Sequence, residues 1–213
     1  MIISFVNQKG GVGKTTLSLA TAFELHKERK VLVVDADPQG SVIGWSDVRD
    51  KELPKGLSIA SLAKKTLHRD LEGLAEGFDH VVIDTPPRLT DITRSAIMAS
   101  HLIVVPCTPS PYDVWATKET LDLIREATIY HKTLRFAFAI NRKVANTVLG
   151  REVKSAIAEL GDDLILLKTE IVHRMVFAEA GVNGNAVQEI DKEGKATQEI
   201  KILVEELLAV GTC

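Results

Sequence analysis

A glycine-rich segment near the start of the chain has the composition of a phosphate-binding loop. Gly10, Gly11 and Gly13 give a flexible backbone whose N–H groups can surround an anion at the N-terminus of a following helix. Lys14 would neutralise the β- and γ-phosphates of a nucleotide, and the hydroxyl of Thr15 would bind Mg²⁺. The predicted nucleotide-binding residues of this loop are Gly10, Gly11, Val12, Gly13, Lys14, Thr15 and Thr16.

The loop departs from the strict pattern G-x-x-x-x-G-K-[ST] at its first position. That pattern requires glycine where this chain has Gln8, and a second lysine, Lys9, stands directly before the glycines. A cation at this place indicates a second positive charge that is directed at phosphate.

Three aspartates follow predicted strands and are candidates for metal and water chemistry. Asp84 ends an apolar run in the arrangement in which a carboxylate holds Mg²⁺ through water. Thr85 follows it, where many motor ATPases carry a catalytic glutamate, so the carboxylate that orients the attacking water must come from elsewhere, and Asp37 is the best candidate. We assign Thr15, Asp35 and Asp84 to the metal site, and Lys9, Lys14 and Asp37 to catalysis.

The elements that position these residues alternate along the chain. Short apolar and β-branched runs predict buried parallel strands at residues 2–6, 30–34, 57–60, 80–83, 101–105 and 134–140. Helical spacing separates them at residues 15–27, 69–76, 91–99 and 116–130. This alternation predicts an α/β fold, an open and mostly parallel twisted sheet with helices on both faces. Ligands of such sheets bind at the carboxyl ends of the strands, where all the motifs above fall.

The remaining third of the chain continues in the same manner. We expect a helix at residues 146–160, a last strand or extended loop at 164–171, a short helix at 172–180 and a C-terminal helix at 195–210. No linker or repeat divides the chain, so residues 1–213 are predicted to form one domain. Trp45 and Trp115 are expected on helices, packed in the core.

Composition excludes several classes of protein. The net charge of -3 and the isoelectric point of about 6.1 indicate no global positive field for nucleic acid or anionic membranes. Cys107 and Cys213 are too far apart in sequence to indicate a disulfide framework or a metal cluster. No segment approaches the length of a membrane span, and no leader is evident, so a cytoplasmic location is expected.

Together these motifs resemble the deviant Walker A ATPases of the ParA/MinD group, and in particular the small, ParF-like partition ATPases of ParA type. The matching segments are residues 9–16, 35–40 and 82–87, and the resemblance covers nearly the whole chain. It implies ATP and Mg²⁺ as cofactors and a weak basal ATPase activity. It also implies that Lys9 reaches the partner's nucleotide in an ATP-sandwich homodimer, that Asp37 positions the attacking water, and that Asn141 contacts adenine.

The resemblance further implies partners. ATP-bound dimers of this group bind DNA without sequence preference, associate with the nucleoid, and are released when a ParB-like or other small adaptor protein stimulates hydrolysis. The candidate DNA contacts are basic residues of the C-terminal third, Arg142, Lys143, Lys168 and Arg174. Larger ParA proteins carry an N-terminal helix-turn-helix extension, which is not expected here because the chain begins at its first strand.

Two alternatives stay open on the sequence alone. A metabolic ATP-dependent ligase of the same superfamily would need a second pocket for a small acid. A MinD-like positioning ATPase would need a basic amphipathic C-terminal helix for anionic membranes. The polar face of residues 197–208 is acidic, which favours packing of this helix on the core and predicts no membrane partner.

Overall fold

The computed structural model describes residues 1–144 and 148–212 of the chain. The strands are β1 Ile2–Phe5, β2 Val31–Asp35, β3 Leu57–Ser61, β4 His80–Asp84, β5 Leu102–Cys107, β6 Arg135–Lys143 and β7 Ile165–Val172. The helices are α1 Lys14–Leu25, α2 Ser41–Asp47, α3 Leu67–Leu74, α4 Asp91–Ala99, α5 Pro111–Tyr130, α6 Val148–Ala158, α7 Met175–Val182, α8 Val187–Ile190 and α9 Lys195–Thr212.

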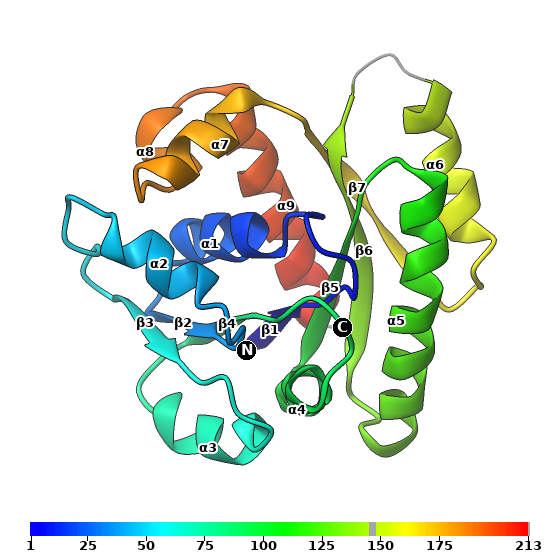
Figure 1. The fold of residues 1–213 in the computed structure, drawn as a ribbon, viewed down its shortest axis with the longest axis horizontal. Coiled ribbons are helices and arrows are strands. Elements are labelled where there is room, and N and C mark those ends of the chain that lie inside the picture. Colours follow the sequence, from blue (N-terminus) through cyan, green and yellow to red (C-terminus); the bar gives the residue numbers. More distant parts are fainter. Residues whose placement is uncertain (145–147, 213) are drawn as a thin grey trace.

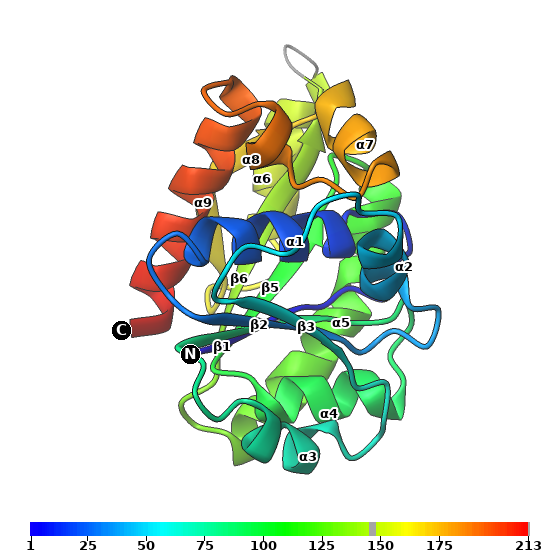
Figure 2. The same ribbon diagram turned by 90° about the vertical axis from the view of Figure 1, so that its left-hand side faces the viewer.

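The seven described strands form one parallel sheet in the order β3-β2-β4-β1-β5-β6-β7, which confirms the predicted fold class. Helices cover both faces: α1, α2, α7, α8 and α9 lie on one side, and α3, α4, α5 and α6 on the other (Figures 1 and 2). In this order β1 is central, with β4 and β5 as neighbours. The loop that leaves β1 therefore emerges between the ends of two other strands.

The central strands are mostly apolar because both of their faces are covered. In β1, Ile3 and Phe5 pack in the cluster under α1 and α9. In β2, Val31 and Val33 join the same cluster, whereas Leu32 and Val34 pack on the opposite face with α3 and α4. Alternate side chains thus serve two different cores.

The structure confirms the predicted strands to within a few residues and establishes residues 164–171 as a strand, β7. Helix α4 coincides with its predicted range. Helix α5 begins at Pro111, five residues before the predicted start at 116, and α7 begins at Met175 because β7 continues to Val172. The first two residues of the predicted helix 146–160 lie outside the described residues.

The two tryptophans differ in how deeply they are buried. Trp45 of α2 is buried, as expected, but Trp115 of α5 is 68% exposed, so its predicted core position is wrong. Trp115 lies on the outer side of a helix whose inner residues, such as Val114 and Thr117, already cover the sheet.

The C-terminal helix α9 packs on the core, as its acidic polar face predicted. Its apolar side buries Ile200, Leu203 and Leu207 in the cluster that it shares with α1 and the sheet. None of the helices within the described ranges is both long and apolar enough to cross a membrane.

Candidate functional site

The glycine-rich loop joins β1 to α1 and turns sharply just before the helix. Gly11 and Gly13 have φ angles of 78° and 96°, a region that side chains disfavour, and Gly13 is the N-terminal cap of α1. A Cβ atom on Gly13 would lie 2.2 Å from Nδ2 of Asn141. The glycine is therefore required both by the turn and by the close approach of the strand β6 residue.

Lys14, the first residue of α1, is buried at the inner side of the loop. Its Nζ donates a hydrogen bond of 3.2 Å to the backbone carbonyl of Lys9. Burial lowers the pKa of Lys14 below its usual range, while the carboxylates of Asp84 and Asp37 act in the opposite direction. An anion placed in the loop would favour the charged form of this lysine.

Thr15 and Asp84 meet where β4 ends beside the first turn of α1. The Thr15 hydroxyl donates to Asp84 Oδ2 at 2.6 Å, and the Ser18 hydroxyl donates to Oδ1 at 3.5 Å. The Asp84 side chain is fully buried, and this burial raises its pKa to about 7. A hydroxyl and a carboxylate in contact are a ligand pair that suits Mg²⁺.

Asp35 and Asp37 stand at the end of β2, next to β4, and make different contacts. Both oxygens of Asp35 accept backbone N–H groups, Oδ1 from Asp37 at 3.0 Å and Oδ2 from Val42 and Ile43 at 2.8 and 3.0 Å. Asp35 therefore caps α2 from the end of β2, and its metal contact stays a prediction. Asp37 Oδ1 accepts the backbone N–H of Gln39 at 2.9 Å, and Asp37 lies near enough to Lys14 to affect its pKa.

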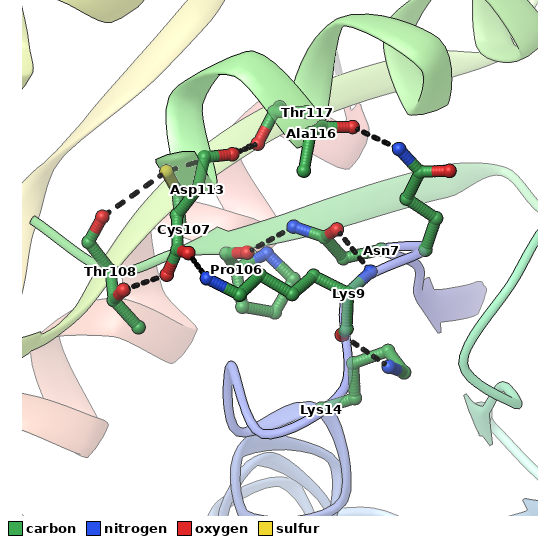
Figure 3. Close-up of polar contacts among 10 residues, drawn as sticks. Asn7, Lys9, Lys14, Pro106, Cys107, Thr108, Asp113, Ala116 and Thr117 are labelled. Atoms are coloured by element: carbon green, nitrogen blue, oxygen red, sulfur yellow. Dashed lines mark hydrogen bonds and ion pairs between the residues drawn. The ribbon is translucent and has the colours of Figure 1, made fainter. Parts of the chain in front are cut away.

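The segment before the glycines is anchored to strand β5 and to helix α5. The Asn7 side chain accepts the backbone N–H of Lys9 at 2.9 Å and donates to the carbonyl of Pro106 at 2.8 Å (Figure 3). Gln8, at the position of the missing glycine, donates from Nε2 to the Ala116 carbonyl at 2.8 Å. The Lys9 ammonium forms an ion pair with Asp113 of the same chain.

Asn141 lies beside the loop, at the end of β6. It is buried, and its Nδ2 donates to the carbonyl of Val12 at 2.7 Å. Its amide is thus bonded to the loop backbone, and the contact with adenine stays a prediction. The adjoining Arg142 has a φ angle of 54° and lines an open hollow together with Lys9 and Gly10.

A separate cavity of about 400 Å³ lies between α1, α2 and the α7–α8 segment. It reaches Thr15 and Thr16 at the start of α1, and Trp45 and Phe177 contribute to its walls. Of the described residues that line it, none is charged. The cavity thus has no ionic group that would hold a small carboxylic acid.

The four basic residues predicted to contact DNA differ in their exposure and in their ion pairs with carboxylates of the same chain. Lys143 forms an ion pair with Glu170, and Arg174 forms a two-pronged ion pair with Glu199 of α9, with distances of 2.5 and 2.7 Å. Lys168 is exposed, and Arg142 lies at the hollow beside the loop.

The structure brings Lys9, Lys14, Thr15, Asp37 and Asp84 to one end of the sheet, as the sequence predicted. The sequence did not indicate Ser18, Asn7 or Asp113 as parts of this site. The polar residue at Ser18, one turn after Thr15 on α1, is the one signal that could have been used.

The family described as the CobQ/CobB/MinD/ParA nucleotide binding domain matches residues 3–187. The chain is 30% identical over 208 residues to maintenance of carboxysome distribution protein A of Halothiobacillus neapolitanus, covering 97% of this chain and 95% of that protein. It is 26% identical over 254 residues to sporulation initiation inhibitor protein Soj of Bacillus subtilis, with 99% of each covered.

A solved structure agrees with the fold. The septum site-determining protein MinD of Pyrococcus horikoshii, complexed with Mg-ADP, has a TM-score of 0.76 and 22% identity, over 98% of this chain and 96% of that one. The predicted nucleotide cofactor agrees with the description of the matching family as a nucleotide binding domain.

Proposed function

Because this chain belongs to the CobQ/CobB/MinD/ParA nucleotide binding domain family and is an ATPase of its ParA/MinD group, we propose that it is a positioning ATPase. ATP binding forms a sandwich homodimer, the dimer binds DNA without sequence preference, and hydrolysis stimulated by a small adaptor releases it. This cycle segregates a plasmid, a chromosome or another cargo, and the name of one relative, maintenance of carboxysome distribution protein A, supports a role in positioning.

The residues at the loop fit a nucleotide with Mg²⁺. Thr15 and Asp84 would hold the ion, because the Thr15 hydroxyl and the Asp84 carboxylate meet at 2.6 Å beside the start of α1. When bound with the nucleotide, the ion would neutralise charge that develops on the transferred phosphoryl group. Lys14 would bind the β- and γ-phosphates from inside the loop.

Asp37 is the carboxylate that would orient the attacking water. It lies at the end of β2, close to Lys14, and one of its oxygens is fixed by the backbone N–H of Gln39. Asp35 fixes α2 and thereby the turn that carries Asp37. The arrangement keeps the Asp37 side chain near Lys14 of the phosphate loop.

The single observation that carries the dimer is the direction of Lys9. Its side chain runs away from Lys14 and lies on the outer side of the loop, 41% exposed (Figure 3). A lysine in this position does not serve the phosphates inside its own loop. This direction supports the proposal that Lys9 serves the phosphates of a second subunit.

DNA binding rests on the family and on the exposed basic groups. Arg142 and Lys168 are exposed, while Lys143 and Arg174 would have to exchange carboxylate partners for phosphates. Contacts of this kind are independent of sequence and weaken steeply with salt. The uncharged lining of the cavity between α1 and α2 gives no support to the metabolic ligase alternative.

The test uses Asp37→Ala, which should keep ATP bound and preserve the dimer. With ATP and Mg²⁺, this variant should retard an arbitrary DNA duplex at about 50 mM salt and lose most binding at about 200 mM. Lys14→Ala is the control, and its affinity for ATP should fall about a hundredfold or more, about 3 kcal/mol. An ATP-loaded dimer that leaves DNA unretarded at low salt would refute the DNA-binding step.

A further inference from the structure

Lys9 is held by an acidic residue of its own subunit. The Lys9 ammonium pairs with Oδ1 of Asp113, in the first turn of α5, while the Thr108 hydroxyl donates to Oδ2 (Figure 3). The Asp113 side chain is only 4% exposed, against 41% for Lys9. The carboxylate is therefore fixed and nearly dry, and the lysine is the mobile member of the pair.

The backbone around the pair is rigid on both sides. Thr117 of α5 donates to the Asp113 carbonyl at 2.6 Å, and Asn7 holds the Lys9 N–H. An open hollow of about 610 Å³ in front of the loop borders both Lys9 and Asp113. Lys9 is the more exposed of the two side chains and has room to swing outward, whereas Asp113 is held by the Thr108 hydroxyl.

We propose that Asp113 is a positioning residue for Lys9, which keeps the lysine within its own subunit until a second subunit offers a stronger anion. Breaking the pair leaves a buried carboxylate with only its hydroxyl donor, which is unfavourable. The pair therefore opposes transfer of Lys9 to the partner's nucleotide and sets the concentration at which ATP-bound subunits dimerise. This inference rests on the proposed function, because it gives Lys9 its task in the dimer.

A purely structural role for Asp113 makes a different prediction. An acidic residue in the first turn stabilises a helix through the helix dipole, whatever stands at position 9. The effect of removing the Asp113 charge would then be the same with Lys9 or with alanine at that position. A positioning role requires that the effect disappear when Lys9 is absent.

The experiment compares the full-length wild type with Asp113→Asn, Asp113→Glu, Lys9→Ala and the double variant Lys9→Ala/Asp113→Asn. Dimerisation with ATP and Mg²⁺ is followed by sedimentation velocity. Asp113→Asn should lower the dimer dissociation constant about tenfold, and Asp113→Glu should stay near the wild type. Asp113→Asn should also raise the basal kcat of the ATPase without changing KM. In the Lys9→Ala background, Asp113→Asn should change neither the dimer dissociation constant nor kcat. An equal change in both backgrounds, or none in either, overturns the proposal.

Two further measurements keep the test decisive. In the nucleotide-free monomer, Lys9 of Asp113→Asn should react several times faster in reductive methylation, followed by mass spectrometry; unchanged reactivity overturns the pair itself. Failure of the wild type to dimerise with ATP overturns the proposed function instead. Should Asp113→Asn not fold, Thr108→Val removes the hydroxyl donor that the carboxylate keeps when Lys9 leaves, so it should hold Lys9 more firmly and raise the dimer dissociation constant. A lowered or unchanged dissociation constant in Thr108→Val overturns the proposal.

Discussion

The buried carboxylate of Asp84 makes the stability of the metal-free protein depend on pH. Removal from water is the largest cause of its raised pKa; the Thr15 hydroxyl opposes it, and the neighbouring charge of Asp35 adds to it. We consider the replacement Asp84→Asn, which keeps the shape of the side chain but cannot titrate.

The magnitude follows from the two protonation equilibria. The pKa is about 7 in the folded protein and about 3.8 in the unfolded chain. Since the folded state binds the proton more tightly, the contribution to stability is complete below pH 3.8 and is lost as pH rises to about 7. At 1.36 kcal/mol for each pKa unit, the free energy of unfolding falls by about 4 kcal/mol over this interval. The wild type loses this amount and Asp84→Asn does not.

The assay is urea unfolding in the presence of a chelator, at about pH 4 and about pH 8.5, with the difference between the two proteins compared at each pH. The advantage of Asp84→Asn over the wild type should grow by about 4 kcal/mol between these conditions. Ser18→Ala, which keeps the carboxylate, should titrate like the wild type. Parallel pH profiles for wild type and Asp84→Asn would show that Asp84 is ionised in the apo protein, contrary to our reasoning.

Two other substitutions test the packing around the site. Arg49→Leu should lower the free energy of unfolding by about 3–5 kcal/mol, because the Arg49 side chain is 3% exposed and its guanidinium forms a two-pronged pair with Glu189. Adding Glu189→Gln should restore part of this loss in the same denaturation assay, and no restoration would contradict a role of the unpaired charge. Gly13→Ala should weaken ATP binding and lower Tm, because the new Cβ would meet Asn141 and the φ angle of Gly13 is positive. Gly44→Ala, with open space around it, should leave Tm unchanged or higher. Equal calorimetric and binding results for the two variants would refute the predicted strain at position 13.

Much of the fold was accessible from the sequence because the central strands are mostly apolar on both faces and strand and helix alternate along the chain as far as β7. Where the observed start of a helix differs from the predicted one, or was not marked in the sequence, the cause is local. Helix α5 begins at Pro111, since proline is well suited to the first helical position, although a serine–proline pair also indicates a loop. Helix α2 has no side-chain cap of its own at Gly40; Asp35 caps it from the strand, so no local signal marked its start.

The site was predictable where one motif carries it and unpredictable where the fold brings distant segments together. The glycines, Lys14 and Thr15 could be assigned because they are consecutive. The contact of Lys9 with Asp113 could not, because it depends on the pairing of β1 with β5, which places the start of α5 beside the loop. Asp35 shows the same limit, since a strand-end carboxylate can bind a metal or a helix and the residue type does not distinguish them.

Gln8 has a consequence for anyone who would transplant this loop. Its side chain donates to Ala116, its N–H donates to the Thr120 hydroxyl at 3.2 Å, and its carbonyl accepts the N–H of Arg88 at 2.9 Å. The residue that breaks the strict motif is thus the residue that joins the loop to α5 and to the segment after β4. A graft of residues 9–16 into another strand–helix scaffold would carry over the glycines and Lys14, but not the setting that directs Lys9. The function of the motif in this chain therefore depends on contacts outside residues 9–16.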